Sequence, residues 1–330
     1  MRRHSRGHPT HFGVRLIIEL ENSGIADYSF EIAARQQGEF EVKRERCYVQ
    51  RAILDEPHVY ELQDGTFTQG LSYIRPKIES DRLALSVVSA VEEFRPVYDF
   101  LTNMRFYSLS PDRIRQLQDP DPGRVLVRDG SNAAAVLREI ASQDRQTYDR
   151  VCRLLAKVVP GTSRAEYLSL GQKETLKFRQ DVGDNHPWSF EALNMSDGTL
   201  RALSILLAVY QVSRPPFIAV EEPEATIHPA ALDVIVDILK DGSEESQMLI
   251  TTHSPDVLDN RRILDGELRL VLSERGQAVI RPISETTRDI IRDNLYSAGE
   301  LLRMDQLEPE DRHEAPQTSL FGKPQKVASR

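Results

Sequence analysis

The chain has 330 residues, 40% of them hydrophobic and 28% charged, which is typical of a globular protein with a sizeable core. Its formal net charge of −9 excludes a broad electrostatic attraction to nucleic acid or anionic lipid, so any DNA binding would need a local basic patch. The two cysteines form no CxxC pair and no apolar run approaches the roughly 20 residues of a membrane helix, so we predict a cytoplasmic protein without a membrane segment.

The first predicted elements are short strands between residues 12 and 79. Apolar and polar residues alternate in 14–20, 28–32 and 40–45, and glycine-containing breaks at 22–24 and 37–38 supply turns. Alternation with a period of two residues predicts an antiparallel sheet with one face in solvent.

A helical period replaces this alternation between residues 80 and 160. Leu83, Val87, Val91 and Phe94 are spaced like one helix face. A second helical stretch contains Ala135, Leu137, Ile140, Tyr148, Val151, Leu154 and Leu155. Because only a Pro/Gly/Asp loop at 119–123 separates the two stretches, we expect a helical lobe inserted into a larger domain.

The third part runs from 161 to 304. Strand character returns at 167–170 and 175–178, and strands and helices then alternate, which predicts a parallel sheet covered on both faces. Residues 305–330 are rich in Pro, Glu, Gln, Lys and Ser, and we expect them to form a disordered tail. The expected organisation is therefore one α/β domain over 1–304, followed by the tail.

Paired carboxylates give the strongest chemical signal in the chain. The apolar run 217–220 leads directly into Glu221, Glu222, Pro223 and Glu224. A buried strand that ends in two carboxylates suits a site where one supports magnesium and its neighbour positions or deprotonates a water. Taken alone, the same pattern also fits a buried strand followed by a solvated acidic turn.

Two further segments have the composition of phosphate contacts. Ser196, Asp197 and Gly198 precede an apolar helix, and such a start exposes backbone N–H groups at the positive end of the helix dipole. His253 follows the apolar strand 247–252 and would lie at its carboxyl end. The alternatives are a simple helix cap and a structural histidine.

The order of these segments carries a family resemblance. Met195 to Arg201 (MSDGTLR) resembles the signature motif of ABC-type ATPases, and FIAVEEPE resembles their Walker B motif. EATIHPAAL resembles the D-loop that follows, and LITTHSP resembles the switch-histidine strand. The chain is most similar to the SMC- and RecF-like branch of predicted AAA-type ATP-binding proteins. This resemblance implies an α/β P-loop NTPase fold with an N-terminal antiparallel β subdomain and a helical insertion.

The resemblance also implies ATP and Mg²⁺ as ligands and a role for each residue that matches a motif. Glu221 would support Mg²⁺, Glu222 would be the catalytic base, and His253 would sense the terminal phosphate. Glu224 and His228 fall in the D-loop. Ser196, Asp197 and Gly198 would contact the nucleotide held by a second protomer, in a head-to-tail homodimer.

The sequence departs from the family pattern at two points. The first Walker B carboxylate is usually aspartate and is Glu221 here. The phosphate loop GxxxxGK[ST] occurs nowhere in the 330 residues, although in the family it should precede the strand at Phe12. We therefore expect a truncated reading frame, or one half of a split ATPase that needs a complementing P-loop-bearing chain, and expect this chain alone to bind ATP poorly. The alternative is a degenerate, non-catalytic module that binds a partner ATPase, nuclease or sliding clamp.

Other partners follow from shorter segments. Gln317, Leu320 and Phe321 lie in a peptide that resembles the motif by which bacterial proteins dock on the replication sliding clamp, although motifs this short also recur by chance. The basic residues 2–6 are a candidate DNA contact or the remainder of the segment behind the phosphate site. Residues 265–282 contain only a short strand pair and no DxD follows, so an intrinsic nuclease is not expected.

Overall fold

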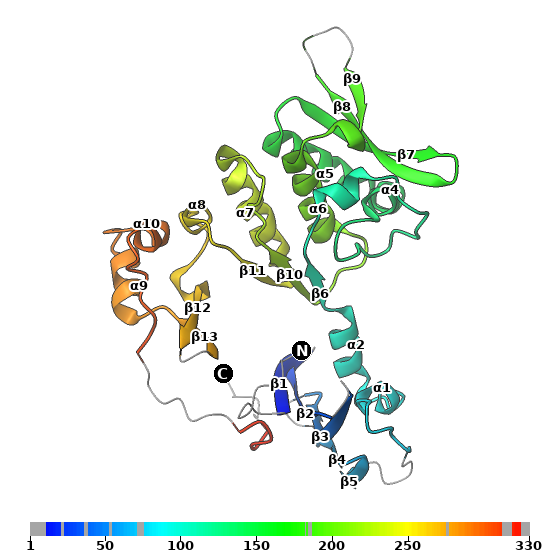
Figure 1. The fold of residues 1–330 in the computed structure, drawn as a ribbon, viewed down its shortest axis with the longest axis vertical. Helices are drawn as coiled ribbons and strands as arrows, with labels where there is room; N and C mark the ends of the chain where they lie inside the picture. Colours follow the sequence, from blue (N-terminus) through cyan, green and yellow to red (C-terminus); the bar gives the residue numbers. More distant parts are fainter. Residues whose placement is uncertain are drawn as a thin grey trace. The chain divides into compact units, whose positions relative to one another are not determined.

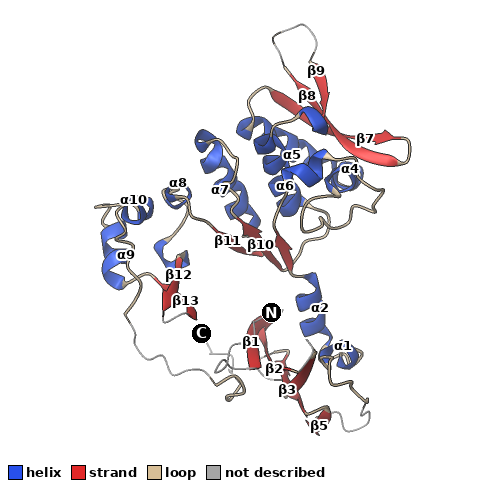
Figure 2. Cartoon of the chain, viewed as in Figure 1, coloured by secondary structure: helices blue, strands red, loops and turns tan. Residues whose placement is uncertain are grey.

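The computed structural model describes residues 11–20, 23–35, 39–52, 55–70, 76–181, 183, 187–274, 277–311 and 319–324. It divides into two compact units, which are described separately (Figures 1 and 2). The first unit comprises residues 1–102 with 313–330, and the second comprises residues 103–312. The structure thus separates the N-terminal sheet from the part that carries the candidate site.

The first unit is built on a five-stranded antiparallel sheet, as the alternation predicts. Its strands follow the order of the chain, β1 to β5, and each pairs with the next. The strands are β1 (His11–Leu20), β2 (Gly24–Ala34), β3 (Phe40–Gln50), β4 (His58–Gln63) and β5 (Thr66–Gln69).

One face of this sheet packs on two helices, α1 (Leu85–Val88) and α2 (Arg95–Asn103), around Tyr28, Tyr60 and Phe94. The single helix face expected from Leu83 to Phe94 is wrong. α1 ends after four residues and leaves Val87 exposed, and α2 starts at a Pro-containing first turn, which favours a helix start over a continued helix.

The second unit contains a three-stranded parallel sheet of β6 (Arg105–Tyr107), β10 (Phe217–Glu221) and β11 (Gln247–Thr251). β10 lies in the centre, in the order β11-β10-β6. The sequence did not predict β6, because three residues within a helical stretch show no period of their own.

Helices α6 (Asp197–Tyr210) and α7 (Leu232–Gly242) lie on one face of this sheet (Figure 1) and bury Ile218 and Val220 of β10. We expected helices on both faces. Instead, Phe106 on β6 is 53% exposed and Leu249 on β11 is 50% exposed. The strands are apolar on both faces, as a doubly covered sheet requires. In the described part of the chain, however, the face that carries Phe106 and Leu249 remains partly exposed to solvent.

Of the helical lobe predicted for residues 80–160, residues 80–102 belong to the first unit, and the second unit contains the rest as one helical cluster. This cluster consists of α3 (Pro111–Arg115), α4 (Ala133–Gln143) and α5 (Arg145–Val158), whose buried residues pack with α6 in one core. Asp144 caps α5 through the N–H groups of Gln146 and Thr147. The Pro/Gly loop between 119 and 123 is also present, and Gly123 has a φ of +76° that favours glycine.

The first three strands after residue 160 do not join the parallel sheet, which corrects the sequence prediction. β7 (Thr162–Leu170), β8 (Lys173–Gln180) and β9 (Trp188–Glu191) form a separate antiparallel sheet. Only Gly171 and Gln172 connect β7 to β8, and a connection this short permits a hairpin but no crossover.

The rest of the second unit consists of short elements. They are η3 (Ala192–Asn194), η4 (Pro229–Ala231), α8 (Pro255–Leu258), η5 (Asp265–Glu267), β12 (Arg269–Glu274), β13 (Gln277–Pro282), α9 (Glu285–Arg292) and α10 (Ala298–Arg303). β12 and β13 are the predicted strand pair and run antiparallel. None of the helices in the described ranges is long and apolar enough to cross a membrane.

The C-terminal stretch differs from the disordered tail that we expected. Residues 319–324 are described, and the N–H of Gly322 donates to the carbonyl of Ser319 at 2.8 Å, which closes a β-turn. This turn belongs to the first unit. Gln317 of the clamp-like peptide lies outside the described residues, whereas Leu320 and Phe321 lie within them.

Candidate functional site

The paired carboxylates lie where two parallel strands end. β10 ends at Glu221 and β11 ends at Thr251, and these two residues are partners in the register. The carboxyl ends of parallel strands form the edge where open α/β sheets bind ligands. Glu221 and Glu222 are both exposed there, so their carboxylates are accessible to a ligand.

Glu222 adopts an unusual backbone conformation. Its φ is +43°, in the left-handed region that non-glycine residues rarely occupy. The N–H of Glu222 donates to the carbonyl of Thr251 at 3.0 Å, so the turn is fixed to the end of β11. Such strained residues gather at functional sites, where the surrounding structure enforces them.

His253 lies beside Glu222, as the strand pattern predicted. Its Nε2 is 4.0 Å from Oε1 of Glu222, and its side chain is 93% exposed. This distance is too long for a direct hydrogen bond. The two groups therefore lie on the same edge of the sheet without being bonded to each other.

Glu224 holds the chain that leads to His253. Its Oε1 accepts a hydrogen bond from the hydroxyl of Thr252 at 2.6 Å and one from the N–H of His253 at 3.3 Å. His228, which the resemblance placed in the same D-loop, instead caps η4 by accepting the N–H of Ala230 at 3.2 Å. The structure brings Glu224 into the group of site residues, whereas His228 has a local structural contact.

The predicted signature residues form the start of α6. Ser196 is the N-cap and accepts the N–H of Thr199 at 3.2 Å, as predicted. The carboxylate of Asp197 pairs with Arg115. A Cβ at Gly198 would lie 2.7 Å from the carbonyl oxygen of Thr226, so only glycine allows this approach between the start of α6 and the loop after β10.

Arg201 joins these segments, and sequence reasoning missed it. Its guanidinium donates to the carbonyls of Glu221 at 2.8 Å and Glu222 at 2.7 Å, and also to the carbonyl of Leu109. Burial lowers the pKa of Arg201, against the charges of the neighbouring glutamates, which raise it. The only signal in the sequence was the position of Arg201 within the signature-like segment.

The geometry of this contact has a chemical consequence. Arg201 binds the backbone oxygens of the two glutamates and makes no hydrogen bond to their carboxylates. It therefore fixes the direction of the chain at the end of β10 while both acid groups stay available for a ligand.

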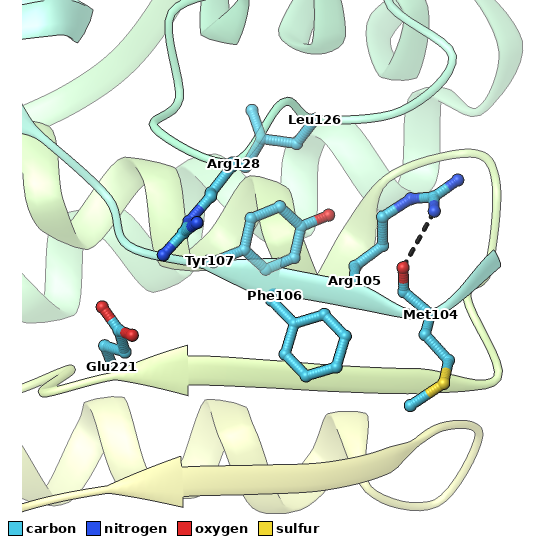
Figure 3. A pocket seen from close by; sticks show the side chains of 7 residues that line it. All are labelled: Met104, Arg105, Phe106, Tyr107, Leu126, Arg128 and Glu221. Atoms are coloured by element: carbon cyan, nitrogen blue, oxygen red, sulfur yellow. Dashed lines mark hydrogen bonds between the residues drawn. The ribbon is translucent and has the colours of Figure 1, made fainter. Parts of the chain in front are cut away.

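A hollow of about 460 Å³ runs along β6 (Figure 3). Its walls come from β6 and the loop after α3, and it reaches the carboxylates only through Glu221. In Figure 3, Arg128 extends over the end of the hollow where Glu221 lies, and Met104 lies at the opposite end. The hollow thus adjoins the site, but the Glu222–His253 pair lies outside its lining.

The carboxylates fit one kind of metal site. No group of three or more His, Cys, Asp or Glu side chains in the described ranges could hold a metal by itself. Magnesium in nucleotide sites needs no such cage, because one or two carboxylates bind it together with substrate phosphates and water. Glu221 and Glu222 match this donor set.

Comparisons with known proteins identify the family. A family model described as "AAA domain, putative AbiEii toxin, Type IV TA system" matches residues 16–259. The chain is also 29% identical over 134 residues to the chromosome partition protein Smc of Mycoplasma genitalium, and 28% identical over 97 residues to Smc of Chlorobaculum tepidum. These matches cover 37% and 29% of the chain but only 13% and 8% of the two Smc proteins.

Solved SMC head domains show weaker likeness. The Smc head bound to the C-terminal winged-helix domain of ScpA is 12% identical, with a TM-score of 0.47, over 84% of this chain and 76% of the other. The Pyrococcus furiosus Smc head with an extended coiled coil, bound to the C-terminal domain of ScpA, is 12% identical with a TM-score of 0.45, over 88% and 82%. The family match covers most of the chain, and the chain belongs to this family of AAA ATPase domains, with the α/β fold of P-loop NTPases.

Proposed function

We propose that the protein binds and hydrolyses Mg²⁺-ATP at the carboxyl ends of β10 and β11. The observation that carries this proposal is the backbone-held pair Glu221–Glu222, with exposed carboxylates and His253 beside them. Membership of an AAA ATPase family supports the same substrate. In this proposal FIAVEEPE is a Walker B motif and Thr251–His253 is the switch strand.

Each acidic residue has its own role in the proposal. Glu221 lies on the strand itself and would support Mg²⁺, which neutralises charge on the phosphates when it is bound. Glu222 lies one residue further out, in the left-handed turn, and would orient the attacking water and accept its proton. His253 would donate a hydrogen bond to the terminal phosphate.

A phosphate-binding loop would complete this site from outside the 330 residues. Two observations support this part of the proposal. No strand in the described ranges pairs with the outer edge of β11, and the half-exposed Phe106 and Leu249 leave apolar surface on the uncovered face of the same sheet. A strand–loop–helix unit would pair with that edge and cover that face, and its loop would supply the lysine and N–H groups that hold phosphates.

A head-to-tail dimer would place the signature turn of one protomer on the nucleotide of the other. The start of α6 suits this contact, because backbone N–H groups next to the N-cap Ser196 lie at the positive end of a 14-residue helix. Arg201 lies on the same helix and holds the two glutamates, so a contact at the turn would act directly on the hydrolytic site.

ATP hydrolysis by the chain mixed with a segment that carries GxxxxGK[ST] tests the function. We expect turnover that requires both Mg²⁺ and the added segment, and we expect Glu221→Ala to remove it. Glu244→Ala changes an exposed acid on the connection after α7 and is the control, with activity unchanged. Equal activity of Glu221→Ala and the unchanged chain would reject the assigned magnesium ligand.

Mixing two inactive variants tests the dimer. Ser196→Arg blocks the signature turn, and Glu222→Gln removes the base. If the two groups act in trans, a mixed dimer contains one intact site, and about a quarter of the activity returns on mixing (half the dimers are mixed, each with one of two sites). No recovery in a mixture that does form heterodimers would show that the two groups act within one protomer.

For the cellular process that ATP hydrolysis drives, we propose a broad class. The family description names a type IV toxin–antitoxin system, and the matched Smc relatives are chromosome partition proteins. Both favour a defence or DNA-related process. The second candidate, a non-catalytic module that binds a partner ATPase or nuclease, is favoured by the lack of GxxxxGK[ST] in the sequence, and it predicts no turnover with any added loop segment.

A further inference from the structure

The face of the N-terminal sheet opposite its core carries a set of charged side chains. Tyr28 and Cys47 point into the core between the sheet and α1–α2. Since side chains alternate along a strand, Arg15, Asp27 and Arg46 lie on the other face. The guanidinium of Arg15 donates to both carboxylate oxygens of Asp27, at 2.9 and 2.6 Å, which fixes its position.

The turn at 319–322 lies on this charged face. Arg15 donates to the carbonyls of Ser319 at 3.0 Å and Lys323 at 3.1 Å. Arg46 donates to the carbonyls of Phe321 at 2.9 Å and Gly322 at 2.7 Å. Two cationic side chains thus bind four backbone oxygens of one short segment, and such charge-assisted hydrogen bonds are stronger than neutral ones.

Two side chains of the turn add contacts that depend on sequence. The ring of Phe321 packs under the guanidinium of Arg44, 4.1 Å from its centroid, which is a cation–π distance. Leu320 lies directly on Gly13, where an added Cβ would come within 2.1 Å of the leucine Cδ2. The sheet therefore has one position for an aromatic ring and one for a branched aliphatic side chain.

Burial shows that the face is covered. Arg46 is only 7% exposed, and Asp27 is fully buried, although both lie on the side of the sheet away from its core. Charged residues are rarely buried to this degree unless they are paired. The docked turn explains this burial, because its carbonyls accept hydrogen bonds from both Arg15 and Arg46.

We propose that residues 319–324 are an internal ligand of a peptide-binding surface formed by Gly13, Arg15, Arg44 and Arg46. In the docked state Leu320 and Phe321 are partly buried against Gly13 and Arg44. Any partner that reads these two side chains, a sliding clamp included, must first displace them from the sheet. A second peptide of the same kind can bind this surface only after residues 319–324 have left it.

Hydrogen–deuterium exchange of the full chain tests the docking. Phe321→Ala leaves every residue of the sheet in place, and we expect it to raise exchange of the Gly322 N–H, which the docked turn holds on the carbonyl of Ser319, at least tenfold. Arg46→Ala should do the same. Lys43→Ala is the matched control, because Lys43 is a cation on the same strand that pairs with Glu41 and Asp64, and it should leave exchange unchanged. Unchanged exchange in both Phe321→Ala and Arg46→Ala would overturn the proposal.

A labelled peptide with the sequence of residues 317–324 tests the surface in trans. The tethered turn competes at a high effective concentration, so the unchanged chain should bind the peptide weakly. The full chain with Leu320→Ala and Phe321→Ala should bind it at least tenfold more tightly by fluorescence anisotropy, and Arg46→Ala added to this variant should abolish the gain. Equal binding by all three chains would contradict the assigned surface.

Discussion

Glutamates in the two units are held in opposite ways. In the N-terminal unit Glu45 is fully buried, and its carboxylate accepts hydrogen bonds from the hydroxyls of Tyr28 at 3.0 Å and Tyr60 at 2.6 Å. It also accepts the N–H groups of Ala84 and Leu85 at the start of α1, at 2.5 and 2.9 Å. In the second unit Arg201 holds the carbonyls of Glu221 and Glu222 instead.

This difference separates a structural acid from the two acids that we propose to be functional. Glu45 uses its carboxylate to join two strands and a helix terminus, so nothing of it remains for a ligand. At Glu221 and Glu222 the backbone carbonyls make the structural hydrogen bonds. Their carboxylates are exposed to solvent at the edge of a parallel sheet. An acid whose main chain is fixed and whose side chain is exposed is the arrangement that a metal–nucleotide site needs.

The largest expected effect comes from removing Arg201. Arg201→Ala leaves three carbonyls near the end of β10 without their donor, and we expect a loss of about 3 kcal/mol in the free energy of unfolding. It should also lower ATP turnover by at least 100-fold, since it frees the turn that carries Glu222. Urea unfolding and a hydrolysis assay measure both. Arg153→Ala, on the exposed side of α5, is the control and should change neither stability nor turnover. If Arg201→Ala also left both unchanged, the structural role assigned to Arg201 would be wrong.

Removing the buried acid should affect stability alone. Glu45→Ala leaves two tyrosine hydroxyls and two N–H groups buried without an acceptor, and we expect it to cost about 3 kcal/mol of unfolding free energy. Urea unfolding followed at the N-terminal unit measures this loss. ATP turnover by the folded fraction should be unchanged. A loss of turnover in the folded fraction would contradict a purely structural role for Glu45.

Two matched helix caps sharpen the comparison at a smaller scale. Ser196 and Ser284 both cap a helix by accepting the N–H of a threonine three residues on, at 3.2 and 3.1 Å. Each serine-to-alanine change should cost about 1 kcal/mol of stability. Only Ser196→Ala should also raise the ATP concentration needed for half-maximal turnover, because only that turn is proposed to contact nucleotide. Equal kinetics in the two variants would remove Ser196 from the site.

The smallest effect is a pH dependence at Glu45. Burial raises the pKa of this carboxyl, although the two tyrosines and two N–H groups oppose the shift. A raised acid pKa stabilises the fold at pH values below the ordinary glutamate pKa, and this contribution is lost as the pH rises through the folded pKa. Glu45→Gln does not titrate, so the stability of the unchanged chain relative to this variant should fall over the pH range above the ordinary glutamate pKa of 4.5. A constant difference over this range would contradict the raised pKa.

Local patterns in the sequence predicted the parts of the site that depend on neighbours along the chain. The buried run of β10, the cap at Ser196 and the strand that ends before His253 all follow from a few consecutive residues. The antiparallel N-terminal sheet follows from alternation in the same way.

Long-range contacts could not be predicted from these patterns. β6 is three residues long and is a strand because it pairs with β10, more than a hundred residues away. Arg201 acts on backbone carbonyls, which every residue has, so no side-chain pattern marks its partners. The docked turn at 319–324 depends on arginines about 300 residues earlier, and composition alone indicated disorder there.

The most direct test of the account is the fate of ATP bound to Glu222→Gln. In the chain supplied with a phosphate-loop segment, radiolabelled ATP is bound, the complex is isolated, and the ratio of ATP to ADP is measured against the unchanged chain. We expect the variant to retain ATP with hydrolysis reduced by at least 100-fold, because the carboxylate that accepts the proton of the water is gone. Conversion of ATP to ADP at the rate of the unchanged chain would contradict the role of Glu222 and the site built on it.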